Sequence, residues 1–239
     1  CNFSGTPGTT SLNASATGTH ENATGPNDCT TLAVTAGQTY ILLITNYSNN
    51  NTGFSLDFTP GSPLSYSSTP TTVVWTGGID NDWFKPGNWG GCAIPSCTID
   101  AVVVNGPVNQ PVINGSGAVC KSLTINPGGS LSIQGNNTLQ LCGDYTNNGD
   151  LSANTASTIY FGPGTATQGI NGNLVGLSQF PNLRIQKTGG QVNLNQDIDI
   201  AGNMTVQSAT SVFNFNGKYI TLDGNFFNAN GSTSIINPE

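Results

Sequence analysis

A short theme of Gly, then Asp or Asn, then a large side chain recurs in the C-terminal half of this 239-residue chain. It occupies residues 142–145 (Cys-Gly-Asp-Tyr), 201–204 (Ala-Gly-Asn-Met) and 223–226 (Asp-Gly-Asn-Phe). The last two copies are 22 positions apart, and the first two are 59 apart, close to three spacings of about 20. A period of this size is typical of a solenoid, in which each coil buries its apolar face against its neighbours. We therefore expect an elongated scaffold.

Short β-rich runs separated by Gly, Asn and Pro turns fill the chain from Thr98 onward, and apolar residues alternate within most of them. Such alternation is typical of half-buried strands, and no segment carries a helical stripe. Residues 122–133 and 182–194 also match each other around a Gly-Gly pair, at an offset of about 60. The sequence predicts an all-β chain whose main part is a β-solenoid, similar to a β-helix, with roughly eight coils of about 21 residues.

A shift in composition near Val74 divides the chain into two predicted domains. Residues 1–70 carry three candidate strands, and we expect a small β-sandwich-like unit there. The candidate strands cover residues 30–35, 38–47 and 54–59. Three strands are few for a closed sandwich, so unpaired strand edges are expected. Residues 71–239 form the expected β-solenoid repeat domain.

The low and negative charge excludes some partners. Charged residues make up 7% of the chain, against about 25% in an average soluble protein. The net charge is −7, and the five Lys and Arg residues are too scattered to neutralise a run of phosphates. No apolar run approaches the roughly 18 residues of a membrane span, and so few cations argue against an anionic membrane surface. We expect neither a nucleic-acid partner nor membrane insertion.

Six cysteines, an even number in a polar chain, favour disulfides and an oxidising compartment. We expect sequential pairing, although six cysteines allow about fifteen arrangements. Cys120 and Cys142 are 22 positions apart and would meet on adjacent coils, roughly 4.8 Å from each other. The other expected pairs are Cys92 with Cys97, and Cys1 with Cys29. The paired spacing typical of a zinc site is absent.

Trp75, Trp83 and Trp89 are the only tryptophans and lie close together in the sequence. One interpretation is a cap that seals the end of the solenoid. The other is a platform for glycan stacking, because aromatic rings offer large apolar faces. We favour the cap and keep the glycan platform as the alternative.

The carboxylates allow two further hypotheses. Asp80 and Asp82 are spaced as in a calcium loop, but the Gly and the distal Glu of an EF-hand loop are absent. A polar turn is favoured there over a weak Ca²⁺ site, and no other cofactor is expected. Asp197 and Asp199 share one side of a predicted strand, where surface exposure is favoured over the paired acids of a glycoside hydrolase. His20 is the only histidine, and no nucleophile-elbow motif accompanies it, so we expect no enzyme.

A family resemblance rests on five short segments and one longer one. The five are residues 75–78 (Trp-Thr-Gly-Gly), 82–83 (Asp-Trp), 88–89 (Asn-Trp), 94–95 (Ile-Pro) and 122–125 (Ser-Leu-Thr-Ile). Together they resemble the opening of Gly/Asn-rich repeat domains in very large surface and secreted proteins of Bacteroidetes, commonly exported by type IX secretion. Residues 36–46 are similar to the last strands of a β-sandwich module in the same kind of protein. The resemblance implies an extracellular or cell-surface adhesin or filament, and it supplies no catalytic residue.

These observations lead to one expected function and two rivals. The chain begins at Cys1 without an initiating Met and lacks the C-terminal sorting domain of such exports, so we expect a mature product or an interior piece. We expect a structural extracellular segment of an adhesin or filament, which self-associates into a homopolymer through strand or solenoid edges. The first rival is a carbohydrate-binding module that uses the three tryptophans. The second is a polysaccharide-degrading β-helix enzyme, which the scarcity of cations disfavours.

Overall fold

The chain divides into two units, Cys1–Ser67 and Ser68–Glu239. The computed structural model describes residues 11–13, 28–30, 70–91, 93–208, 210–228 and 235–237. In the first unit, β1 (Ser11–Asn13) pairs in parallel with β2 (Asp28–Thr30). The strands predicted over 38–47 and 54–59 lie outside the described residues, and so does most of the predicted β-sandwich-like unit.

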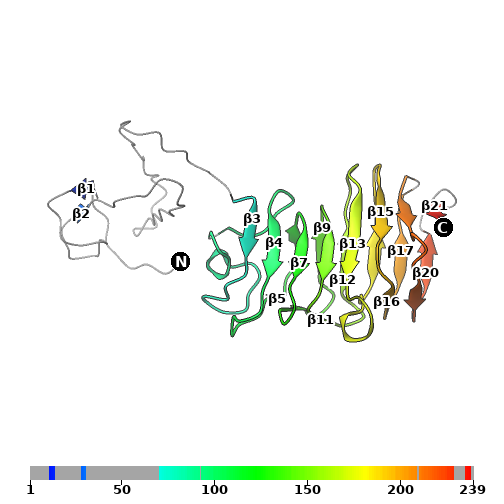
Figure 1. Ribbon diagram of the computed structural model, residues 1–239, viewed down its shortest axis with the longest axis horizontal. Coiled ribbons are helices and arrows are strands. Elements are labelled where there is room, and N and C mark those ends of the chain that lie inside the picture. The colour runs from blue at the N-terminus through cyan, green and yellow to red at the C-terminus, as the bar shows by residue number, and fades with distance from the viewer. Residues whose placement is uncertain are drawn as a thin grey trace. The chain divides into compact units, whose positions relative to one another are not determined.

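The second unit is a β-solenoid of about six turns, as the repeat period predicts. Figure 1 shows the coils following one another along the unit, with strands of neighbouring coils side by side. All pairings between its named strands are parallel, and the chain visits three faces in turn before it starts the next coil. The described residues contain no α-helix; the two helical segments are single 3₁₀ turns, η1 (Pro86–Asn88) and η2 (Gly176–Ser178).

The first and third faces of the solenoid are each one parallel sheet, and the second face consists of two separate parallel sheets. The first face contains β3 (Thr72–Val74), β4 (Asp100–Val103), β7 (Leu123–Ile125), β10 (Tyr145–Asn147), β13 (Gln168–Gly172), β15 (Gln191–Leu194), β18 (Val212–Asn214) and β21 (Ile235–Asn237). The second contains β5 (Val112–Ile113), β8 (Ser130–Ile133) and β11 (Asp150–Ala153), then β16 (Ile198–Ile200) and β19 (Ile220–Leu222). The third contains β6 (Ala118–Cys120), β9 (Thr138–Leu141), β12 (Thr158–Phe161), β14 (Leu183–Ile185), β17 (Met204–Val206) and β20 (Phe226–Asn228).

The register of the first face gives the length of a coil. Leu123 pairs with Tyr145, and Tyr145 pairs with Ile170, so stacked residues are 22 and 25 positions apart. The predicted period is therefore confirmed. The predicted number of roughly eight coils is too high, because several coils exceed 21 residues and residues 75–99 form a cap between β3 and β4 instead of a regular coil.

The core is a set of apolar ladders that run through the coils. Within most strands every second residue is buried, because alternate side chains point to opposite faces of a strand. On the third face, for example, Leu139, Ile159 and Leu183 stack in register and are 0–1% exposed. Burial of a side chain of this size contributes roughly 1.5–3 kcal/mol.

The Gly-Asp/Asn theme marks a corner of the coil, not one fixed face. Residues 142–145 lead into β10 on the first face, whereas residues 201–204 and 223–226 lead into β17 and β20 on the third. The offset of 59 positions is therefore not three whole coils, and that interpretation was wrong. At each corner the Gly allows close approach to the preceding coil: a Cβ on Gly202 would lie 2.4 Å from the Asn182 Oδ1. The large residue then enters the core, as Tyr145 and Met204 do.

Candidate functional site

The three tryptophans pack against one another inside the cap. Trp75, Trp83 and Trp89 are 0–1% exposed, and Trp89 packs edge-on against both of the others. The Trp89 Nε1 donates to the Trp83 carbonyl at 2.9 Å, and the Trp75 Nε1 donates to the Asn109 carbonyl at 2.6 Å. Rings without an exposed face cannot stack on a sugar, so the alternative of a glycan platform at these residues is contradicted. Their burial is what a cap requires.

The cysteines pair differently from the sequential prediction. Cys97 and Cys142 form a disulfide with their Cα atoms 5.3 Å apart, which excludes both Cys120–Cys142 and Cys92–Cys97. Cys120 is a buried free thiol. Cys92 and Cys1 lie outside the described residues. For Cys29 the structure describes only the backbone, in β2, so the predicted Cys1–Cys29 pair remains a prediction.

Asp80 and Asp82 build a hydrogen-bonded turn over the cap. The Asp80 Oδ1 accepts from the buried Asn88 Nδ2 at 2.8 Å and from the Asp82 amide at 3.0 Å, and its Oδ2 pairs with Lys85. The hydrogen bond from Lys85, before the others, lowers the pKa of Asp80 to about 2. The Asp82 Oδ1 accepts the Phe84 amide at 3.0 Å. In the described part of the chain, no three His, Cys, Asp or Glu side chains gather as a metal site.

The second predicted carboxylate pair also links coils. The Asp197 Oδ1 accepts the Tyr219 amide of the next coil at 3.0 Å. The Asp199 Oδ2 accepts the Gly176 amide of the preceding coil at 2.9 Å. These bonds give both carboxylates a structural role at the edges of the second face. His20 lies outside the described residues.

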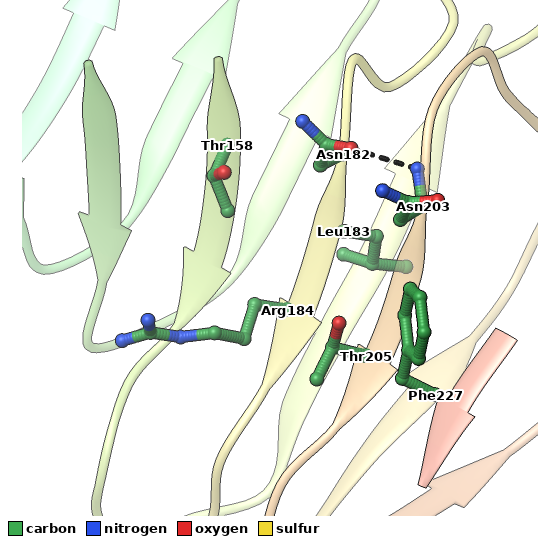
Figure 2. Close-up of a pocket in the computed structure, with 7 residues that line it drawn as sticks. All are labelled: Thr158, Asn182, Leu183, Arg184, Asn203, Thr205 and Phe227. Atoms are coloured by element: carbon green, nitrogen blue, oxygen red, sulfur yellow. Dashed lines mark hydrogen bonds between the residues drawn. The ribbon is translucent and has the colours of Figure 1, made fainter. Parts of the chain in front are cut away.

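A groove on the outer side of the third face is the feature that the sequence did not indicate (Figure 2). It encloses about 260 Å³ and crosses β12, β14, β17 and β20. Its lining consists of Thr158, Asn182, Leu183, Arg184, Asn203, Thr205 and Phe227. The polar members belong to two outward-facing rows, so the groove offers hydroxyl, amide and guanidinium groups beside one aromatic ring.

The register explains why this surface is hollow. Arg184 pairs with Thr205, and Thr205 pairs with Phe227, so one short side chain lies between two long ones. In Figure 2, Thr205 lies between Arg184 and Phe227. The parallel row starts with Thr158 and continues through Asn182 and Asn203, which are linked because the Asn203 amide donates to the Asn182 Oδ1 at 2.7 Å. The short threonines form the floor, and Arg184 and Phe227 form the rims.

Beyond this groove, the last coil among the described residues leaves apolar side chains uncovered. Along one ladder, exposure rises from 1% at Leu183 and 2% at Met204 to 43% at Phe226, although all three occupy the same inward position. On the second face, Ile220 and Leu222 are likewise half-buried above two fully buried isoleucines of the preceding coil. This edge, defined by Ile220, Leu222 and Phe226, is called the open coil edge below.

The fold defines a β-solenoid protein. Residues 74–173 match a family described as a domain of unknown function (DUF8693), which is less than half of the chain. The match covers the tryptophan cap and the first coils up to the end of β13, and it stops before the open coil edge. Comparisons with curated proteins and with solved structures gave no match. Within the described residues, no helix has the length and apolar character of a membrane span.

Proposed function

We propose that this chain is a structural segment of an extracellular or cell-surface adhesin or filament, and that it binds further copies of itself through the open coil edge. The observation that carries this proposal is the exposure of Phe226 at a ladder position that is buried in the preceding coils. Another coil stacked on this edge would bury the 43% of that side chain that is still exposed, with a gain of roughly 1 kcal/mol. The few charged side chains, 7% of the chain, leave little repulsion to oppose stacking.

The backbone of the last coil supports the same role. Strands β19, β20 and β21 each pair with one neighbour from the preceding coil and with no other strand among the described residues. An exposed strand edge offers unpaired N–H and C=O groups to another chain. Strand addition to a copy is therefore the recognition mode that we propose for the homopolymer.

The opposite end of the first face is less suited to strand addition. There Trp75 and Trp89 form an antiparallel bridge, and the Gly90 amide donates to the Val74 carbonyl at 2.7 Å beside β3. The segment around Trp89 and Gly90 therefore occupies part of the outer edge of β3. We therefore propose that two copies first meet through their open coil edges, related by a twofold axis that pairs their strands antiparallel. Such a contact closes a dimer, so growth of these dimers into the homopolymer requires a second contact elsewhere on the chain.

Phe226→Asp tests the proposal, because it places a charge at the centre of the contact. Light scattering with size-exclusion chromatography over a range of concentrations should show self-association of the unchanged chain and monomers of the variant. Leu177→Asp is the matched control, since Leu177 is 92% exposed on η2 and away from the open coil edge. Its association should equal that of the unchanged chain.

Two results would contradict the proposal. The first is an unchanged chain that stays monomeric on concentration. The second is a Phe226→Asp variant that associates as strongly as the control, while circular dichroism shows that both are folded. Electron microscopy of the assembled material distinguishes paired particles from longer rods.

A further inference from the structure

Arg184 has a fixed side chain and no ionic partner in the described part of the chain. The two ion pairs found there, Lys85–Asp80 and Lys121–Asp100, do not include it. Its guanidinium carbon lies 3.8 Å from the centroid of the Tyr160 ring, a cation–π arrangement. The Tyr160 hydroxyl in turn donates to the Gln186 Oε1 at 2.8 Å, which holds the ring in place. The guanidinium is thus oriented by its neighbours and not neutralised by them.

The donors of this guanidinium are unused within the described residues. Its Nε is buried and has no hydrogen-bond partner there, which is a cost that a native structure normally avoids. A planar guanidinium binds a carboxylate, phosphate or sulfate through paired hydrogen bonds. In a protein of net charge −7, a preoriented cation without a counterion at the rim of a groove indicates an anionic ligand group.

The rest of the groove offers partners for hydroxyl groups and for one apolar ring face. The Asn203 Oδ1 accepts the Asn225 amide at 2.9 Å, whereas its Nδ2 has no partner among the described residues. The hydroxyls of Thr158 and Thr205 likewise make no hydrogen bond within them. Phe227 is 48% exposed. In Figure 2 the Arg184 side chain extends away from Thr205 and Phe227, and its guanidinium lies over Tyr160, which is three strands from Phe227, roughly 14 Å along the sheet. That distance spans about three sugar units.

We propose that this groove binds an acidic saccharide. A carboxylate on one sugar unit pairs with Arg184, the next unit lies over Thr205, and the apolar face of a third unit packs on Phe227. Asn203 and the threonines contact the sugar hydroxyls. This site is distinct from the buried tryptophans, and the inference does not depend on self-association.

An acidic peptide fits the same surface less well. Strands β14 and β17 are paired on both sides, so neither offers backbone groups for strand addition. Only β20, at the Phe227 end of the groove, has an open edge, so a peptide that reaches Arg184 would have to cross the strands and bind there through side chains alone. The free polar groups of this shallow groove are suited to hydroxyls. Acidic peptide binding is therefore the competing outcome of the test.

The experiment is isothermal titration calorimetry of the full chain with three probes at the same concentration. These are a linear trimer of galacturonic acid, the matching neutral trimer of galactose, and a trimer of glutamic acid. We expect saturable binding of the galacturonic acid trimer and binding at least tenfold weaker, or none, for the other two. Arg184→Gln should weaken the first by about tenfold or more, as loss of a charged hydrogen-bonded contact does.

Three variants distinguish binding in the groove from a nonspecific effect of positive charge and from a loss of folding. Lys218→Gln removes the same charge outside the groove lining and should leave binding unchanged. Phe227→Ala should weaken binding severalfold. Thr205→Tyr fills the floor of the groove while it keeps Arg184, and it should abolish binding with an unchanged unfolding midpoint. Equal binding of the neutral trimer or the peptide, full affinity in Arg184→Gln or Thr205→Tyr, or no binding of any probe at millimolar concentration would overturn the inference.

Discussion

Trp75 and Trp89 are joined by an antiparallel β-bridge, and their rings meet edge to face with centroids 4.9 Å apart. Trp83 packs against the other side of this pair, with its centroid 4.7 Å from that of Trp89. Trp89 is therefore the central ring of the cap, and its indole nitrogen is also hydrogen-bonded to the Trp83 carbonyl. The three rings belong to the same buried core as Val73 of β3.

We predict that Trp89→Ala is among the most destabilising single changes in the solenoid. It removes a fully buried ring from between two others, and such a truncation costs about 3–5 kcal/mol. Urea unfolding followed by circular dichroism measures the loss. Val108→Ala is the control, because Val108 is 99% exposed and its truncation should change the free energy of unfolding by less than about 0.5 kcal/mol. A similar small change in Trp89→Ala would contradict the structural role of the cap.

The disulfide and the free thiol give a second prediction. Mass spectrometry of the unreduced, digested protein should find Cys97 linked to Cys142. Burial raises the pKa of the Cys120 thiol, so iodoacetamide at pH 8 should leave it unmodified in the folded protein and label it in urea. A peptide that links Cys120 to Cys142, or rapid labelling of Cys120 without urea, is the result that the structure excludes.

The cysteines illustrate how far a period can predict contacts. The spacing of 22 correctly places Cys120 and Cys142 on adjacent coils, since the Cys142 amide donates to the Cys120 carbonyl at 3.0 Å. However, the in-register partner of Cys120 is Leu141, one position earlier. Because side chains alternate along a strand, an offset of one residue turns Cys120 into the core and Cys142 away from it. A sequence period alone does not resolve a single-residue offset.

The repeated theme shows a similar limit. Its Gly and its large residue predict a solenoid because every coil has to close a corner and fill a core. All corners share this requirement, so the sequence around Tyr145 on the first face resembles that around Met204 on the third. The architecture was therefore predictable, whereas the assignment of each copy to a face was not.

The groove could not be predicted for a related reason. Arg184, Thr205 and Phe227 are separated by 21 and 22 positions, and no motif links them in the sequence. They come together only through the register of β14, β17 and β20. An alignment of the outward-facing residues of successive coils, in the correct register, would have identified the three groove residues.

A third prediction concerns the Gly of the theme. In Gly202→Ala the new Cβ would lie 2.4 Å from the Asn182 Oδ1 and 2.5 Å from the Pro181 carbonyl oxygen, so two coils would have to separate. We expect a loss of about 1–3 kcal/mol in the free energy of unfolding, the usual cost of overpacking. Gly90→Ala is the matched control, because its Cβ would make only ordinary contacts, the nearest at 3.4 Å. Equal stability of the two variants would show that the coils do not approach as closely as the structure has them.

Lys187 lies in the interior of a corner, which makes its charge costly. It is 1% exposed, and its Nζ donates to the Gln168 Oε1. Gln168 is itself buried and donates through its Nε2 to the Gly143 carbonyl at 2.6 Å and the Leu141 carbonyl at 3.2 Å. An amide is a weaker partner than a carboxylate, so burial lowers the pKa of Lys187 below its ordinary value of 10.5.

We predict that this lysine makes the solenoid less stable at neutral pH than at alkaline pH. Above the pKa of Lys187 in the unfolded chain, the amine is neutral in both the folded and the unfolded state and does not change the free energy of unfolding. As the pH falls from 10.5 through the lower pKa of the folded state, the folded protein has to accommodate a buried charge and loses stability. Cys120 and Tyr145 act in the opposite direction, because burial raises the pKa of each and stability is lost as the unfolded chain ionises. The difference in free energy of unfolding between the unchanged chain and Lys187→Met isolates the effect of the lysine, because Cys120 and Tyr145 are present in both proteins.

The measurement is the free energy of unfolding of the two proteins between pH 7 and pH 10.5. The stability of the unchanged chain relative to Lys187→Met should rise with pH across this range. Lys218→Met serves as the control because Lys218 is exposed, and its difference from the unchanged chain should not depend on pH. A difference for Lys187→Met that is flat, or that falls with pH, would mean that the Lys187 ammonium is well solvated or paired in the folded protein.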